Sequence, residues 1–413
     1  MSTHFPAALS TAQTLAAPLR DPRTAWHGTV RPGGRAWPQS LAGGAAGIAL
    51  LHIELARSGH ADWVPAHTWI AAAVQGEITA AANASLFFGT PALAFVVHLA
   101  AEATNQYRRA LARLDEATLT ITRTRIAHAR ARIAKGERPG LREFDLIRGL
   151  AGLGAYHVSA HPSAPITRDI LACLISLTRP IPDGGELPPW WTPVAPSGEP
   201  SPDFPQGHGN LGVSHGISSV LAVLSLAHLR GITIHGMPDA ITRICAWTDQ
   251  WRQDGCNGPW WPGFITADQA REHHVDPMLR PRPSWCYGIA GTARAQQLAG
   301  IALREPARQE AAEAAMLAVL RDPTELDRLQ DPGLCHGTAG LLNAASRIAG
   351  DARTTDIREE LPGLCSRLMT QLALRTDPSP ELLDGTAGIA LALHAVSAGG
   401  GTGPSWDAVF AVA

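Results

Sequence analysis

Seven segments of this chain are apolar nearly all round, and each opens on an element that resembles Gly-x-x-Gly. A helix with apolar residues on every side is typically buried over most of its surface. The pattern therefore predicts seven buried helices, and the charged, amphipathic stretches between them, such as Asn105 to Lys135, suit outer helices. The first glycines of the seven copies are Gly44, Gly89, Gly149, Gly216, Gly288, Gly337 and Gly385.

Successive copies begin 45 to 72 residues apart, which leaves room for one inner helix, one outer helix and their connections. Seven such hairpins could stack as an open solenoid or close into a ring. Open ends would need polar capping repeats, but the copy that starts at Gly385 is as apolar as the middle copies. We therefore expect an all-α fold, an α/α toroid of inner and outer helices, in which residues 1–413 form a single domain.

Two segments interrupt the repeat. The stretch from Pro180 to Gly209 is rich in Pro, Gly and Ser and is longer than an ordinary connection, so it is a candidate functional loop. The stretch from Asp254 to Pro283 also looks irregular. We expect small elaborations of the domain at about residues 100–140 and 180–210. The sequence assigns no role to the loop histidines His208, His273 and His274.

The composition excludes several classes of protein. The 34 basic and 36 acidic residues give a formal charge of −2. A nucleic-acid-binding surface needs a basic excess to neutralise phosphates, so we expect no nucleic-acid partner. Hydrophobic residues make up 45% of the chain and charged residues only 17%, which allows a substantial core. Lys135 is the only lysine, and this excludes a lysine Schiff base at any other position.

Targeting signals are absent from the sequence. The N-terminal residues lack a basic region followed by an apolar run, so they do not resemble a secretory signal. The longest apolar stretch without a charge, Leu86 to Ala101, contains Pro91 and His98 and is too short for a membrane span. Six cysteines are too few for a disulfide scaffold in a chain of this size. These features predict a cytoplasmic protein with reduced cysteines and without a transmembrane segment.

The repeat places reactive side chains at equivalent positions. If the copies are related by rotation about one axis, the residues just before each first glycine converge at one end of the ring. His215 and His336 stand directly before the first glycines of copies four and six. Cys286 and Cys335 stand one position earlier, in copies five and six. This register predicts a cluster of two thiols and two imidazoles, which core packing alone does not explain.

Two thiolates and one imidazole suit Zn²⁺. Cys286, Cys335 and His336 are therefore candidate zinc ligands, and three protein ligands leave the fourth position open, as in catalytic zinc sites. The alternative is that the two cysteines are small buried apolar residues. The other four cysteines do not share the register, and the chain has no Cys-x-x-Cys motif.

Three further residues are candidates for acid–base work or charge stabilisation. His215 suits a general acid or base because its unperturbed pKa lies near neutral pH, although it could instead cap a helix. Asp145 lies one helical turn before Gly149 and could orient His215 or a substrate amide, or it could be a solvated aspartate. Arg282 lies four residues before Cys286 and could stabilise developing negative charge, or it could be an ordinary exposed arginine.

The chain contains, in this order, FDLIRGLAG, NLGVSHGIS, SWCYGIAG, CHGTAG and LDGTAG. These motifs resemble those of the lanthionine synthetase C-like family, the lanthipeptide cyclases, and the resemblance covers essentially the whole chain. Family members are α/α toroids of seven inner and seven outer helices, which agrees with the repeat. This sequence departs from the family's pattern at Ser218 and Ser219 and at Pro91 and Ala92, and none of these is a candidate ligand.

Members of the family cyclise a precursor peptide whose Ser and Thr residues have been dehydrated to dehydroalanine and dehydrobutyrine. A cysteine thiol of the peptide adds to the dehydro residue and leaves a thioether. The resemblance implies zinc ligands at Cys286, Cys335 and His336. It also implies that His215 protonates the enolate formed by thiol addition, with Asp145 and Arg282 in supporting roles.

We expect a stand-alone zinc-dependent cyclase, because the chain lacks the long dehydratase region that precedes the cyclase in bifunctional synthetases. Its partners would be a dehydrated precursor peptide, leader and core, and a dehydratase, while peripheral membrane association is left open. The alternatives are a related enzyme that adds glutathione to dehydroamino acids and a non-catalytic toroid that binds peptide as a scaffold. Trp190, Trp191 and Trp260 are candidate peptide contacts, with ordinary loop anchoring as the alternative.

Overall fold

The computed structural model of the protein describes residues 5–25, 37–182, 184–255, 258–375, 379–398 and 405–413. The chain divides into two compact units. Unit 1 consists of Met1–Thr118 and Asp327–Trp406, and unit 2 consists of Leu119–Leu326 and Asp407–Ala413. The expectation of one domain stays a prediction.

The seven predicted inner helices are all present. Each begins directly after its register glycine, and each is largely buried. They are α3 (Ala45–Arg57), α5 (Thr90–Thr104), α8 (Leu150–Ala160), α10 (Ile217–Leu229), α13 (Ile289–Leu303), α16 (Thr338–Asp351) and α18 (Thr386–Ala398).

Further helices of 10 to 27 residues accompany them. In α9, the residues Ile166, Ile170, Leu174 and Leu177 are buried at helical spacing, as expected of a helix with one apolar face. Proline occupies the first or second position of several of these helices, where its missing N–H leaves no hydrogen bond unmade. They are α1 (Pro6–Ala16), α4 (Val64–Ala73), α6 (Arg108–Ala134), α9 (Pro165–Leu177), α11 (Met237–Gln250), α14 (Pro306–Leu320) and α17 (Asp356–Ala373).

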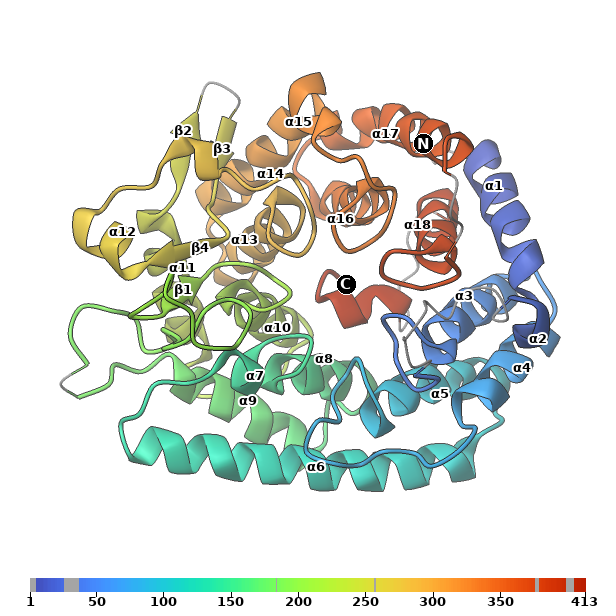
Figure 1. Cartoon of the computed structure of the whole chain (residues 1–413), viewed down its shortest axis with the longest axis horizontal. Coiled ribbons are helices and arrows are strands. Elements are labelled where there is room, and N and C mark those ends of the chain that lie inside the picture. The colour runs from blue at the N-terminus through green and yellow to red at the C-terminus, as the bar shows by residue number, and fades with distance from the viewer. Residues whose placement is uncertain (1–4, 26–36, 183, 256–257, 376–378, 399–404) are drawn as a thin grey trace. The chain divides into compact units, whose positions relative to one another are not determined.

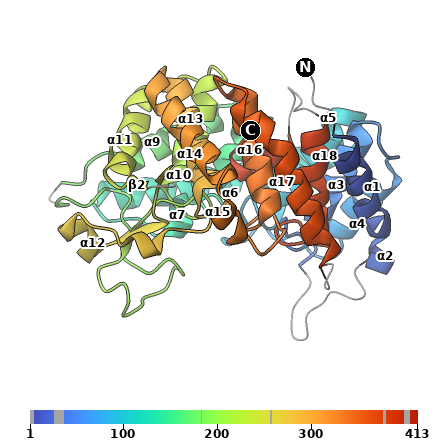
Figure 2. The same ribbon diagram turned by 90° about the horizontal axis from the view of Figure 1, so that it is seen from above.

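In unit 1 the inner helices α16, α18, α3 and α5 follow one another as packed neighbours (Figure 1). Helix α17 packs against α16, α1 against α18 and α4 against α3, and Figure 2 shows α17 alongside α16. The N-terminal helix α1 therefore supplies the outer partner of the last inner helix, α18. This pairing gives the last repeat a complete helical hairpin.

In unit 2 the inner helix α10 packs between α8 and α13 (Figure 1). Their outer partners are α9 for α8, α11 for α10 and α14 for α13. Across the described residues of both units, none of the helices combines the length and the apolar composition that crossing a bilayer requires.

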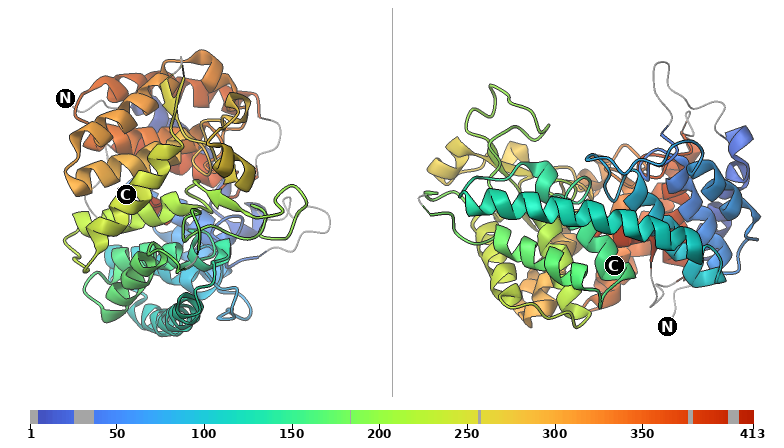
Figure 3. Two further views of the ribbon diagram at one scale, coloured as in Figure 1. Left: turned by 90° about the vertical axis from the view of Figure 1, so that its left-hand side faces the viewer. Right: turned by 90° about the horizontal axis from the view of Figure 1, so that it is seen from below.

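The two segments that interrupt the repeat both lie in unit 2. The first runs from the end of α9 to strand β1 (His208–Asn210) and projects beyond the helices of this unit (Figure 3). The second, expected to be irregular, contains β2 (Gln253–Gly255), β3 (Gly258–Trp260), β4 (Phe264–Thr266) and the short helix α12 (Ala267–Glu272). Strand β1 pairs antiparallel with β4, and β2 pairs with β3. The remaining short elements are η1 (Ala17–Leu19), α2 (Pro22–Ala25), α7 (Leu141–Phe144), η2 (Pro277–Leu279), α15 (Pro323–Asp327) and η3 (Trp406–Phe410).

Close backbone approach explains the first glycine of the repeat. The chain before each inner helix folds back across the helix start, so that a Cβ atom added at Gly288 would lie 2.0 Å from the Arg282 carbonyl oxygen. At Gly149 the same atom would lie 2.4 Å from the Asp145 amide nitrogen. First-turn N–H groups donate to carbonyls of this returning chain, as Gly152 does to Asp145 (3.3 Å). These bonds replace the side-chain cap that most helices use.

A second repeated contact joins neighbouring copies within each unit. In unit 2, the Leu146 amide donates to the Ser214 carbonyl (3.2 Å), and the Val213 amide donates to the Cys286 carbonyl (2.9 Å). In unit 1, the amide of Cys335 donates to the Leu383 carbonyl (3.0 Å). Four of these residues, Ser214, Cys286, Cys335 and Leu383, stand two positions before the first glycine of their copy. Within each unit, therefore, the equivalent turns lie together at one end of the inner helices.

Candidate active site

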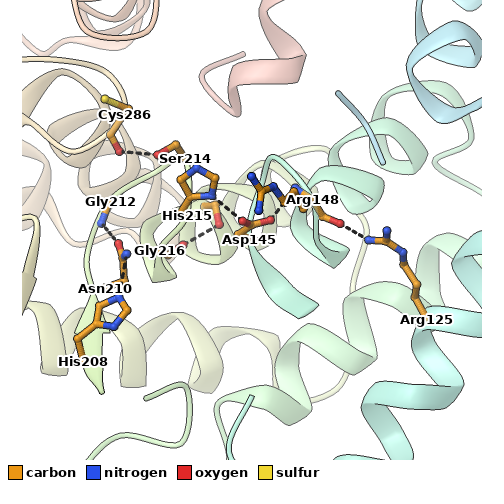
Figure 4. A network of polar contacts seen from close by, with 11 residues as sticks. Arg125, Asp145, Arg148, His208, Asn210, Gly212, Ser214, His215, Gly216 and Cys286 are labelled. Carbon is orange, nitrogen blue, oxygen red and sulfur yellow. Dashed lines mark hydrogen bonds and ion pairs between the residues drawn. The ribbon is translucent and has the colours of Figure 1, made fainter. Parts of the chain in front are cut away.

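A buried aspartate and a partly exposed histidine meet at this end of unit 2. Asp145 directly follows α7, and its side chain is 1% exposed, whereas the His215 side chain is 28% exposed. The Oδ2 atom of Asp145 lies 2.6 Å from Nδ1 of His215 (Figure 4). Because a carboxylate can only accept, Nδ1 of His215 donates. The other nitrogen, Nε2, is then the one available for proton exchange with a substrate.

The Asp145 carboxylate has a second partner, and that partner is itself held in place. The Arg148 amide donates to Oδ1 of Asp145 (2.6 Å), which helps to compensate for the burial of the charge. The carbonyl of Arg148 in turn accepts a hydrogen bond from the Arg125 guanidinium on α6 (Figure 4). Burial lowers the pKa of Arg125, and the nearby Asp145 charge opposes this shift. Nothing in the sequence pattern pointed to Arg125 or to the Arg148 backbone.

Cys286 is fixed beside the turn that carries His215. Its carbonyl accepts hydrogen bonds from the amides of Val213 (2.9 Å) and Ser214 (3.2 Å). The Ser214 hydroxyl also donates to this carbonyl (3.3 Å; Figure 4). Cys286 itself is 8% exposed, and its Sγ atom lies 3.5 Å from the hydroxyl of Ser284. Cys286 and Ser214, which stand two positions before the first glycines of copies five and four, are thus neighbours.

Tyr287 completes the polar lining of this turn in unit 2. Its ring centre lies 6.4 Å from that of His215. Burial raises the pKa of Tyr287, and side-chain hydrogen bonds with Asn210 and Ser214 partly oppose the rise. The phenol is therefore neutral at physiological pH. A Cβ atom at Gly212 would lie 2.7 Å from the Tyr287 ring, so only glycine lets the turn pass this close.

In unit 1, Cys335 and His336 occupy the turn before α16. The amides of Leu334 and Cys335 both donate to the carbonyl of Leu383, at 2.7 and 3.0 Å. Nε2 of His336 lies 3.5 Å from Oδ1 of Asp384, the register residue of copy seven. A carboxylate beside one ring nitrogen is the usual companion of a histidine that ligates metal through the other.

Arg282 is the candidate site residue that the structure leaves apart. Its side chain is exposed, and among the described residues it forms no hydrogen bond or ion pair with Asp145 or His215. Only its backbone carbonyl, which accepts from the Ser284 amide (2.7 Å), takes part in the turn before α13. Its role in charge stabilisation stays a prediction.

The cysteines outside the register have the properties of core residues. Cys173, Cys245 and Cys365 are buried and reduced. Burial raises the pKa of Cys173 and Cys365 to about 11 and that of Cys245 to about 12, so each is a thiol at neutral pH. Cys256 lies outside the described residues.

The loop tryptophans are buried, which favours anchoring over peptide contact. Trp190, Trp191 and Trp260 are 3%, 1% and 4% exposed. The indole N–H of Trp191 donates to the carbonyl of Gln206 (2.8 Å), and the Trp190 ring packs edge-on against Trp247. These residues hold the two inserted segments against the helices of unit 2.

Comparisons with known proteins identify the family and the fold of the chain. A family model described as lanthionine synthetase C-like protein matches residues 35–410. The nisin biosynthesis protein NisC of Lactococcus lactis subsp. lactis is 24% identical over 147 residues, and this alignment spans 35% of the chain and only about a third (34%) of that relative. A solved structure, nisin cyclase, matches with a TM-score of 0.78 at 19% identity, over 98% of this chain and 97% of that one. The structural match confirms the expected fold class, and the family match confirms the resemblance read from the motifs. The chain belongs to the lanthionine synthetase C-like family.

Proposed function

We propose that the chain is a zinc-dependent lanthipeptide cyclase that adds cysteine thiols of a dehydrated precursor peptide to dehydroalanine or dehydrobutyrine. Family membership supports this reaction. The observation that carries the proposal is the shared position of four reactive residues. Cys286, His215, Cys335 and His336 all stand in the turn that precedes an inner helix, one or two positions before its first glycine.

The donor set fits zinc. Cys286, Cys335 and His336 would each supply one ligand atom to the ion, a sulfur from each cysteine and a ring nitrogen from the histidine. Two thiolates and one neutral imidazole are typical of zinc and leave a fourth position for a substrate. Asp384 beside His336 supplies the kind of outer partner that such a ligand has. A peptide thiol bound at the open position would be deprotonated, and so nucleophilic, at neutral pH.

His215 and Asp145 would then supply the proton that completes the addition. Addition of a thiolate to the β-carbon of a dehydro residue forms a carbon–sulfur bond and leaves an enolate, which needs one proton at the α-carbon. His215 as an imidazolium delivers that proton from Nε2, because Nδ1 is held by Asp145. The buried Asp145 carboxylate stabilises the imidazolium and keeps the ring in one orientation.

The test is a thiol count combined with an intact mass. The zinc-loaded protein is incubated with a peptide that carries one free cysteine and one dehydroalanine, and free thiols are labelled with an alkylating agent before and after. The proposal predicts loss of the thiol without a change in peptide mass. In a parallel sample with glutathione, a product heavier by one glutathione would favour the glutathione-adding alternative. Tight peptide binding with a persistent thiol would favour the scaffold.

A further inference from the structure

His208, a buried histidine to which the sequence assigned no role, is connected through Asn210 to the turn that carries His215. His208 lies at the start of β1, is 0% exposed, and pairs through its backbone with Thr266 of β4 and with Thr192. Its Nδ1 atom lies 2.7 Å from the carbonyl oxygen of Val194, in the first inserted segment. A carbonyl only accepts, so Nδ1 of His208 carries a proton and donates.

The second ring nitrogen must then be an acceptor. Burial lowers the pKa of His208, which keeps the imidazole neutral, and a neutral ring with its proton on Nδ1 has a lone pair on Nε2. Nε2 lies 3.3 Å from Nδ2 of Asn210 (Figure 4). This contact sets the Asn210 amide with its NH₂ group toward His208. The amide oxygen of Asn210 therefore faces the opposite way.

The amide oxygen of Asn210 holds the turn before α10. Oδ1 accepts a hydrogen bond from the Gly212 amide (3.0 Å; Figure 4). It also fills the space beside Gly216, where an added Cβ atom would lie 2.4 Å from Oδ1. The side chain of Asn210 thus contacts the turn on both sides of His215. If its amide were reversed, the NH₂ group would meet the Gly212 N–H and the turn would lose this support.

We propose that His208 is a positioning residue, which orients Asn210 and through it the turn that presents His215 to the substrate. The chain of contacts runs from the Val194 carbonyl through His208 and Asn210 to Gly212. This role rests on the proposed function of His215 as the proton donor. It also gives a reason for the QGHGN run, in which a histidine and an asparagine alternate with glycines.

Two substitutions separate the two hydrogen bonds of His208. His208→Asn keeps a donor near the Nδ1 position but removes the acceptor for Asn210. His208→Gln places an amide oxygen near the Nε2 position, where it accepts from Asn210, and gives up the bond to Val194. We expect His208→Asn to lower kcat for cyclisation at least 10-fold with little change in KM or zinc content, and His208→Gln to lose no more than about 3-fold. The exposed His128→Asn is the matched control.

A second readout needs no substrate. In protein labelled with ¹⁵N-histidine, the Nδ1–H signal of His215, assigned by its loss in His215→Asn, reports the bond to Asp145. The proposal predicts that this signal shifts or exchanges faster in His208→Asn and in Asn210→Ala but not in His208→Gln. An unchanged signal and wild-type kcat in folded, zinc-loaded His208→Asn or, if that variant does not fold, Asn210→Ala would overturn it. If the wild-type protein cyclises nothing, the proposed function fails, and the signal still decides the role of His208.

Discussion

The Nδ1 atom of His215 lies 2.6 Å from the Oδ2 atom of Asp145, and the aspartate is almost completely buried while the histidine is not. A buried carboxylate against one nitrogen of an accessible imidazole fixes the orientation of the ring and the nitrogen that carries its proton, as in other acid–base pairs. The two residues are 70 positions apart in the sequence. The hydrogen bond from the Leu146 amide to the Ser214 carbonyl joins the turns that carry them.

Replacing Asp145 by asparagine, a side chain of similar size without the charge, tests the role of this pair. Asp145→Asn retains one oxygen that can accept from His215, but its NH₂ group replaces the oxygen that accepts from the Arg148 amide, and it loses the negative charge that stabilises the imidazolium. We expect the rate of cyclisation to fall about 10- to 100-fold in folded protein, with zinc content close to that of the wild type. The rate is followed by mass spectrometry of labelled thiols. The exposed Asp169, which pairs with Arg130, supplies the control Asp169→Asn. A wild-type rate in Asp145→Asn would remove the aspartate from the mechanism.

The repeat made the inner helices predictable because close backbone approach requires glycine at each helix start. The same register indicated Cys286, Cys335, His336 and His215 as candidates, since equivalent positions of the repeat are expected to lie at the same end of the inner helices. The sequence could not indicate Arg125 or the orientation of Asn210. Those contacts join segments that share no periodicity, and their geometry depends on how the inserted segment before β1 packs.

The two kinds of glycine in this chain predict opposite effects of alanine. At Gly288 a Cβ atom would lie 2.0 Å from the Arg282 carbonyl oxygen, so Gly288→Ala must displace backbone. At Gly363, inside α17, nothing lies within 4 Å of the added atom. We expect Gly288→Ala to lower the free energy of unfolding by more than about 2 kcal/mol. We expect Gly363→Ala to raise it by about 0.5–1 kcal/mol. Denaturant titrations measure both, and equal effects would contradict the explanation of the repeat.

Substitution of a proposed zinc ligand should remove bound zinc, whereas substitution of a core cysteine should not. Cys335→Ala should abolish bound zinc and cyclisation, because two remaining ligands hold the ion poorly. Cys173→Ala, at a buried thiol outside the register, should retain both. Metal analysis of the purified variants, together with Tm values to confirm folding, measures the difference. Full zinc occupancy in folded Cys335→Ala would rule that cysteine out as a ligand.

His52 predicts a loss of stability in acid. Its Nε2 atom donates to the Leu19 carbonyl (2.7 Å), and burial lowers the pKa of His52 from 6.5 to about 4. Below pH 6.5 this histidine binds a proton in the unfolded chain but stays neutral in the folded chain until the pH approaches 4. The free energy of unfolding therefore falls between pH 6.5 and 4, by up to about 3 kcal/mol from this residue. His52→Gln should flatten this slope in unfolding measurements, and the exposed His128→Gln should not. An unchanged slope in His52→Gln would show that His52 is not the residue responsible.

The buried Trp191 predicts an effect on stability without an effect on peptide affinity. Trp191→Phe removes the hydrogen bond to the Gln206 carbonyl and leaves a void, which should lower the free energy of unfolding by about 1–3 kcal/mol. The exposed Trp37→Phe should change it little. KM for the dehydrated peptide should match that of the wild type in both. A several-fold rise of KM in Trp191→Phe would point to the peptide contact that its burial argues against.

The central claim is that a zinc site built from the register residues drives addition of a peptide thiol to a dehydro residue. The most direct measurement is the rate of thiol loss at constant peptide mass, in the zinc-loaded protein and after zinc removal by a chelator, with zinc then restored. We predict fast thiol loss with zinc, a rate near that of the free peptide without it, and recovery on restoration. Thiol loss at the same rate in the zinc-free protein would contradict the claim.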